Sequence, residues 1–259
     1  MSRIRMMIAI AAGLVMTGAA GLAGAQFPFK GYLGDAMPDT TPVVPPAPQP
    51  GSPQAEADRA IFKATRALKG TPRWDLAVVD VDERKIVSNM ACAIGAEVTM
   101  VNSPKLTKVL IRVAPDLTHA VDRPKAAYNR KRPYLVDEGD ICVEKSDKLA
   151  ASPDYPSGHA SWGWAVGLIL ADLVPERAGP ILQRARVFGE SRVVCGVHNA
   201  SAVEAGRTNG AAVVAALHGS PEFRADMDAA RVELAALRAK AQPIAACDAE
   251  AALLAQPAW

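Results

Sequence analysis

Apolar residues recur at helical spacing in several stretches of the chain. In one stretch the apolar positions are separated by four, three and four residues: Trp162, Val166, Ile169 and Leu173. This spacing places the four side chains on one face and predicts a buried helix over residues 159–174, ended by Pro175. Gly163 and Gly167 lie one turn apart within it, which indicates close packing against another helix.

Other stretches give similar predictions. We expect helices to begin at Asp58, which is a capping residue type, and after Ser103-Pro104, and we expect Pro115 to interrupt the second of these. A further amphipathic helix follows Ser220-Pro221, with apolar positions Phe223, Met227, Ala230, Leu234 and Leu237. Residues 77–86 are an ambiguous run, and no stretch alternates convincingly as a strand does. The pattern therefore predicts an all-α fold.

The N-terminal part of the chain differs in composition from the rest. Residues 1–25 combine a short basic start, an uncharged apolar run and an Ala-Gly-Ala ending, which is typical of a cleavable signal peptide, although an uncleaved membrane anchor is the alternative. Residues 26–57 form a Pro-rich extended segment, either a spacer or a strap over the core. We expect residues 58–259 to form one helical domain.

Charge limits the classes of partner. The chain has 29 basic and 27 acidic residues, and removal of the signal peptide deletes two arginines, which leaves 27 of each. A neutral mature protein has no electrostatic basis for binding nucleic acid or an anionic membrane. Apolar runs after residue 25 are about 15 residues at most, so we expect no stable membrane insertion. Whether the protein forms a homo-oligomer stays open.

Four cysteines follow the signal peptide: Cys92, Cys142, Cys195 and Cys247. An even number in an exported chain predicts up to two disulfides, with three pairings open. Their spacing does not match that of metal-binding cysteine pairs.

Three short segments place cationic and hydroxyl side chains beside histidines: residues 125–133, 156–159 and 191–198. Each segment alone has an ordinary structural explanation, such as a solvated helix end, a helix cap or a packed histidine. Their order and spacing match the three-part signature K-x6-R-P, P-S-G-H and S-R-x5-H of the type 2 phosphatidic acid phosphatase superfamily. With the stretch 67–74, the chain resembles the bacterial class A non-specific acid phosphatases over roughly residues 54–240.

The resemblance implies a helical bundle of the acid phosphatase and vanadium-dependent haloperoxidase type, acting on small phosphate monoesters in the periplasm or outside the cell. It also implies a site in which five residues hold the phosphate: Lys125, Arg132, Ser157, Gly158 and Arg192. His198 would attack phosphorus and form a phosphohistidine, and His159 would protonate the leaving oxygen. Such a cationic site suits the charge that develops on a phosphoryl group, and we expect no metal or other cofactor.

One position departs from the family pattern. The histidine is normally followed four residues later by an aspartate that orients it, but this chain has Ala202 there. On a helix, Glu204 would point to another side, and Ser201 offers only an uncharged acceptor. We therefore expect one of two outcomes: hydrolysis is slowed, by roughly ten- to a thousandfold, or another group has taken the place of the aspartate.

Two alternatives use the same residues. A catalytically impaired phosphate-binding relative is suggested by Ala202, and a vanadate-dependent haloperoxidase is disfavoured by the short chain. A membrane lipid phosphatase is disfavoured by the frequent charges. We expect His119 and His218 to be structural or surface residues. Three further residues border the motifs, and we expect them to be packing or helix-surface residues, with a place at the substrate entrance as the alternative: Tyr128, Asn129 and Tyr155.

Overall fold

The computed structural model describes residues 29–259, and this part of the chain contains helices but no strand. The α-helices are α1 (Pro53–Thr65), α2 (Pro72–Val79), α3 (Ile86–Asn89), α4 (Ala91–Ile94), α5 (Pro104–Tyr128), α6 (Asp147–Ala151), α7 (Gly158–Leu173), α8 (Ala178–Val194), α9 (Ala200–Leu217), α10 (Pro221–Arg238) and α11 (Cys247–Leu254). Short 3₁₀ turns include η3 (Glu83–Lys85) and η4 (Pro133–Leu135). The predicted all-α class is confirmed.

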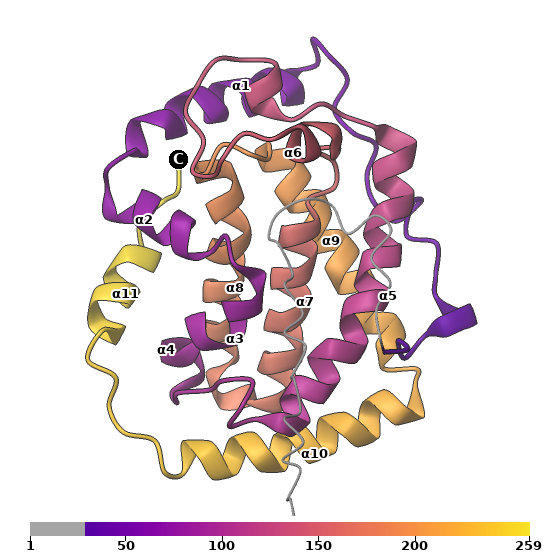
Figure 1. Ribbon diagram of the computed structural model, residues 1–259, viewed down its shortest axis with the longest axis vertical. Helices are drawn as coiled ribbons and strands as arrows, with labels where there is room; N and C mark the ends of the chain where they lie inside the picture. The colour runs from indigo at the N-terminus through magenta and orange to yellow at the C-terminus, as the bar shows by residue number, and fades with distance from the viewer. Residues whose placement is uncertain (1–28) are drawn as a thin grey trace, which may run out of the picture.

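Helix α7 forms the centre of the bundle. It packs between α8 on one side and α9 and α5 on the other, while α10 crosses one end and α1 crosses the other (Figure 1). Its apolar side chains belong to the main hydrophobic core; Val166 and Leu170, for example, have no measurable exposure. The N-terminus of α7 therefore lies at the α1 end of a rigid, densely packed bundle.

Small residues let α7 approach its neighbours closely. A Cβ atom added to Gly163 would lie 2.4 Å from the ring of Phe188 on α8, and one added to Gly167 would lie 2.4 Å from Cβ of Ala185. Both distances are far below van der Waals contact, so the predicted packing role of these glycines is confirmed. The bounds predicted for α7 and α10 also agree with the structure.

Two helix boundaries differ from the prediction. Helix α1 begins at Pro53, five residues before Asp58, because Ser52 caps it and proline suits the first helical position. Asp58 lies inside α1 and is buried, where its carboxylate bonds Ser201 and Arg130. The ambiguous run 77–86 contains the end of α2 and η3, so it is not a strand.

The predicted interruption at Pro115 is wrong, because α5 continues through Pro115 to Tyr128. A proline inside a helix costs about 3 kcal/mol. Beyond it, however, α5 buries Leu117, Ala120 and Val121, and each large apolar side chain contributes about 1.5–3 kcal/mol when it leaves water. Packing therefore outweighs the local cost, and α5 extends far enough to present Lys125.

The Pro-rich segment is a strap that contacts the helical domain. Thr40 donates a hydrogen bond to the carbonyl of Ala120 at 2.9 Å, and the Tyr155 hydroxyl donates to the carbonyl of Pro45 at 2.8 Å. Val44 is buried beside Tyr155. Of the two alternatives for this segment, the strap is the correct one. The proposed signal peptide lies outside the described residues, and the domain boundaries remain predictions.

Two disulfides join the four cysteines. Cys92 pairs with Cys247, which fixes the start of α11 to α4. Cys142 pairs with Cys195, just after α8 and three residues before His198. The expected number of disulfides is confirmed, and the structure selects one of the three pairings.

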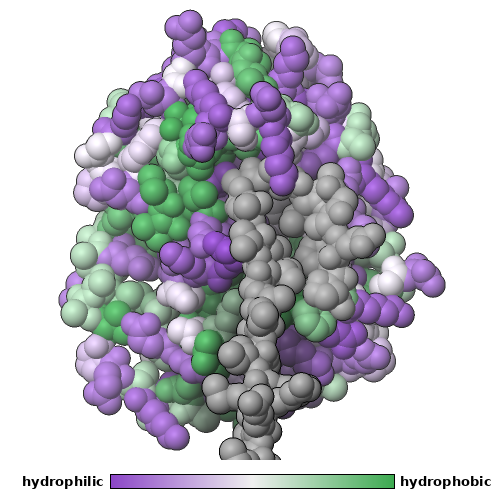
Figure 2. Space-filling view, viewed as in Figure 1, coloured by the Kyte–Doolittle hydropathy of each residue, from purple (hydrophilic) through white to green (hydrophobic). Residues whose placement is uncertain are grey.

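Hydrophilic side chains predominate on the visible surface, with smaller hydrophobic patches between them (Figure 2). Exposed apolar residues include Val101 and Val232. Among residues 29–259, no helix combines the length and apolar character that crossing a bilayer requires.

Candidate active site

The three sequence segments meet at the loop that leads into α7. Three consecutive carbonyl groups of this loop each contact a different side chain. The carbonyl of Ser152 accepts from Nε of Arg132 at 2.7 Å, and that of Pro153 accepts from the ammonium of Lys125. The carbonyl of Asp154 lies 2.7 Å from Nδ1 of His198. This loop therefore links the first and third segments to the second.

The first segment supplies two buried cations. Lys125 lies in the last turn of α5, and Arg132 precedes η4. Burial, with the positive charge of Arg132, lowers the pKa of Lys125 to about 7. Burial also lowers the pKa of Arg132. Burying a cation is costly, so both groups favour binding an anion.

The third segment forms a turn. Arg192 lies near the C-terminus of α8, and the backbone carbonyl of Arg192 accepts from the amides of Val197 and His198 at 3.1 and 3.3 Å. His198 thus lies between α8 and α9 and not on a helix, so the helical-face comparison with Glu204 does not apply. Nη1 of Arg132 donates to the carbonyl of Val197 at 2.8 Å, which fixes this turn against the first segment.

The ring of His198 has a defined orientation. Nδ1 faces two acceptors of Asp154, the backbone carbonyl and Oδ1, the latter at 2.9 Å. Nε2 lies 3.1 Å from Nη1 of Arg132. Burial, and then the positive charges of Arg132, Lys125 and Arg192, lowers the pKa of His198 well below its ordinary value. The ring is therefore neutral over a wide pH range, with its proton on Nδ1 and its lone pair on Nε2.

Arg192 has donors that no described residue accepts. Its Nε and Nη1 atoms are buried and form no hydrogen bond within the described part of the chain. Burial lowers the pKa of this guanidinium to about 10. Buried donors are rarely left unpaired, and the oxygens of a bound phosphate would supply acceptors for them.

The second segment begins α7. Ser157 caps the helix, its Oγ accepting from the amide of Ala160 at 3.2 Å, and Gly158 is the first helical residue. A Cβ atom on Gly158 would lie 3.3 Å from Val121, so a larger residue would crowd α5. The helix N-terminus adds a positive dipole end near the cations.

His159 is held on two sides. Its Nδ1 lies 2.9 Å from Oε1 of Glu83, and its ring stacks on Phe188 with centroids 4.3 Å apart. Nε2 is buried and has no partner among the described residues. Burial and the charge of Arg192 lower the pKa of His159, and Glu83 partly offsets this effect. The remaining nitrogen is therefore free to exchange a proton with a bound ligand.

The sequence did not identify two of these contacts, Asp154 and Glu83. Asp154 lies two residues before the Pro-Ser-Gly-His segment, and its full burial could not be inferred from its acidic character. Glu83 lies 76 residues before its histidine. Of the two side chains weighed beside position 202, Ser201 contacts Asp58 and not the ring, and Glu204 is exposed and pairs with Arg207.

The other singled-out residues lie outside this cluster. Tyr128 and Tyr155 pack edge to face at 5.4 Å against the Pro-rich strap, which agrees with a packing role. His119 and His218 are exposed, as expected for surface residues.

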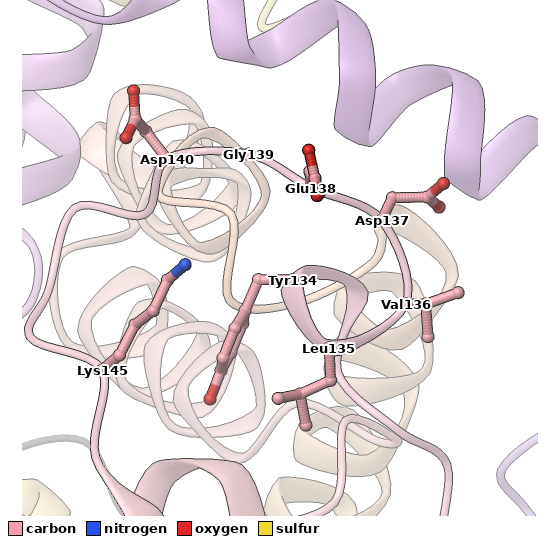
Figure 3. A pocket seen from close by; sticks show the side chains of 8 residues that line it. All are labelled: Tyr134, Leu135, Val136, Asp137, Glu138, Gly139, Asp140 and Lys145. Carbon is pink, nitrogen blue, oxygen red and sulfur yellow. The ribbon is translucent and has the colours of Figure 1, made fainter.

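A surface hollow of about 660 Å³ lies elsewhere. It is lined by Tyr134, Leu135, Val136, Asp137, Glu138, Gly139, Asp140 and Lys145, and Figure 3 shows its three carboxylates. None of the clustered cations or histidines lines it. We therefore do not place the phosphate-binding site in this hollow.

An all-α bundle that gathers three cations and two histidines at the N-terminus of a buried helix defines a phosphate-handling protein. Residues 106–225 match the PAP2 superfamily. The chain is 42% identical over 199 residues to an acid phosphatase of Zymomonas mobilis, covering 76% of this chain and 75% of that protein. It is 34% identical over 204 residues to a non-specific acid phosphatase of Providencia stuartii (77% and 82% covered). It is 33% identical over 198 residues to one of Salmonella typhimurium (74% and 78% covered).

The chain therefore belongs to the non-specific acid phosphatases of the PAP2 superfamily, which are phosphoric monoester hydrolases.

Proposed function

We propose that this protein is an exported acid phosphatase that hydrolyses small phosphate monoesters through a phosphohistidine on His198, without a metal ion. The observation that carries the proposal is the orientation of that ring. Two acceptors fix the proton on Nδ1, and Nε2 points to the guanidinium of Arg132. When a phosphate group draws Arg132 to its own oxygens, the lone pair of Nε2 becomes available for attack.

Five groups bind the phosphoryl group in this proposal. Arg132 and Arg192 donate paired hydrogen bonds to its oxygens, and Lys125 contributes a point charge. The Ser157 hydroxyl and the Gly158 amide add donors at the start of α7. Together the cations neutralise the charge that accumulates on the equatorial oxygens, which is the role a metal ion plays in other phosphatases.

Catalysis then proceeds in two displacements. Nε2 of His198 forms a bond to phosphorus while the ester P–O bond breaks, and the imidazolium form of His159 gives its proton to the leaving oxygen. Water next attacks phosphorus, passing a proton to His159, and the P–N bond breaks. The products are the alcohol and inorganic phosphate, and both histidines return to their initial state.

The opposite demands on the two rings predict an acid optimum. His198 must be neutral, and its low pKa allows this in mildly acidic solution. His159 must be protonated, and its lowered pKa restricts this form to acidic pH. Activity in the free enzyme therefore falls as pH rises through the pKa of His159.

Export is supported by residues 1–25 and by two disulfides, which persist in oxidising compartments such as the periplasm.

The test is phosphate release from a generic aryl phosphate in the presence of a chelator, at about pH 5–6, just below the ordinary histidine pKa. We expect release by the wild type and its loss in His198→Ala. No release by the wild type would favour the impaired phosphate-binding relative, and equal release by both proteins would exclude His198 as the nucleophile. Bromide oxidation that requires vanadate and peroxide would instead indicate the haloperoxidase.

A further inference from the structure

The imidazole of His198 contacts a carboxylate that comes from another segment of the chain. Oδ1 of Asp154 lies 2.9 Å from Nδ1, and the side chain of Asp154 is fully buried. Position 202, four residues after the histidine, holds Ala202 and offers no side-chain acceptor. Of the two alternatives for the absent aspartate, a slowed enzyme or another group in its place, this contact supports the second.

We propose that Asp154 is the positioning residue of His198 and replaces the carboxylate missing at position 202; this inference rests on the proposed function of His198 as nucleophile. Nδ1 keeps its proton because both of its neighbours, Oδ1 and the carbonyl of Asp154, are acceptors. As the bond from Nε2 to phosphorus forms, the ring becomes positively charged. A carboxylate next to Nδ1 stabilises that charge, whereas a carbonyl alone only orients the ring.

The surroundings of position 202 fit this relocation. Ala202 is fully buried in a small cluster with Val44, Ala47, Tyr155 and Ala205. Its carbonyl accepts from the amide of Ser157 at 2.9 Å. The residues of this cluster are mostly apolar, so a carboxylate placed there would lose water at a cost.

Asp154 itself is held in place from the other side. The backbone amide of Asn199 donates to Oδ1 at 3.1 Å, and Nδ2 of Asn199 donates to Oδ2 at 2.8 Å. Nε of Arg130 lies 3.7 Å from Oδ2. Burial raises the pKa of Asp154, but these donors to both oxygens favour the ionised form. The carboxylate is thus oriented before substrate arrives.

The primary test is Asp154→Asn, which preserves shape and one acceptor but removes the charge. We expect kcat to fall about a hundredfold, because a charge-assisted hydrogen bond to the developing imidazolium is lost. KM and the inhibition constant for inorganic phosphate should stay within about threefold, because the cations remain. A variant with wild-type kcat would overturn the proposal, as would a parallel loss of phosphate binding, which marks a structural role.

Two further variants sharpen the test. Asp116→Asn alters another buried carboxylate, which accepts from the amides of Tyr32 and Leu33, and it should keep kcat near the wild-type value while lowering stability. Ala202→Asp should not raise kcat, because Nδ1 already has two acceptors. A gain of about tenfold or more, an increase of at least 1.4 kcal/mol in transition-state stabilisation, would show that Asp154 does not fill the role.

The outcomes distinguish a failure of the proposed role of Asp154 from a failure of the proposed role of His198 as nucleophile. If His198→Ala keeps full activity, the nucleophile assignment fails. If His198→Ala is inactive and Asp154→Asn is fully active, only the role of Asp154 fails. If Asp154→Asn does not fold, a measurement on the wild type tests the proposal. The imidazole nitrogen NMR shifts of His198 should place the proton on Nδ1. A neutral ring protonated on Nε2 would overturn the proposal.

Discussion

Glu83 gives the sharpest prediction about the acid step. Its Oε1 lies 2.9 Å from Nδ1 of His159, while Nε2 of that ring has no partner among the described residues. The carboxylate favours the imidazolium form, which donates the proton to the leaving oxygen in the proposed mechanism. The perturbation is Glu83→Gln, which keeps the size of the side chain and removes its charge.

The expected magnitude follows from the contact. A hydrogen bond to a charged group contributes about 1.5–3 kcal/mol, and the Glu83 side chain is 33% exposed, so solvent screening favours the lower value. About 1.5 kcal/mol corresponds to roughly a tenfold loss in kcat. Because Glu83 raises the pKa of His159, its neutralisation lowers that pKa and moves the alkaline limb of the kcat profile to lower pH.

The assay is a steady-state pH profile with an aryl phosphate, comparing wild type, Glu83→Gln and the control Asp82→Asn. Asp82 is adjacent and pairs with Arg84, without contacting His159. The loss in Glu83→Gln should be larger at neutral pH than at acidic pH, and the control should follow the wild type. An unshifted alkaline limb, or a shift in the opposite direction, would refute the reasoning.

Three further predictions concern the proposed phosphate-binding cations and the hydrophobic core. As pH rises through about 7, Lys125 loses its charge in the free enzyme, so competitive inhibition by phosphate should weaken; Lys125→Arg should remove that dependence. Gly163→Ala should cost about 1–3 kcal/mol in urea unfolding and lower kcat, since its Cβ would lie 2.4 Å from the Phe188 ring that stacks on His159, the proposed general acid. Asp80→Asn leaves the fully buried Arg184 guanidinium without its 2.5 Å partner and should cost about 3–5 kcal/mol by the same measurement. Unchanged unfolding midpoints would contradict the last two predictions.

The features that the sequence predicted well are local ones. Helix α7 is apolar along most of its length, and the period of apolar residues in α10 reflects a buried face, so both elements follow from neighbouring residues alone. The fixed spacing in the segments around Lys125, His159 and His198 likewise identified side chains that the fold brings to one loop.

The features that could not be predicted depend on distant contacts. Pro115 is tolerated because α5 is packed along its length, which the local rule for proline does not include. Asp154 and Glu83 reach their histidines from other segments, and no periodicity links those positions. The sequence shows that position 202 holds alanine and not the aspartate of the family pattern. That the carboxylate of Asp154 contacts the His198 ring instead could be found only from the fold.

The most direct test of the mechanism is to trap the covalent intermediate. Wild-type enzyme turning over a radiolabelled phosphate monoester would be quenched in denaturing alkali, where a P–N bond survives, and the labelled peptide would be identified by mass spectrometry. The account predicts acid-labile label on His198, absent from His198→Ala. No label on the enzyme during rapid turnover, or label on a different residue, would contradict it.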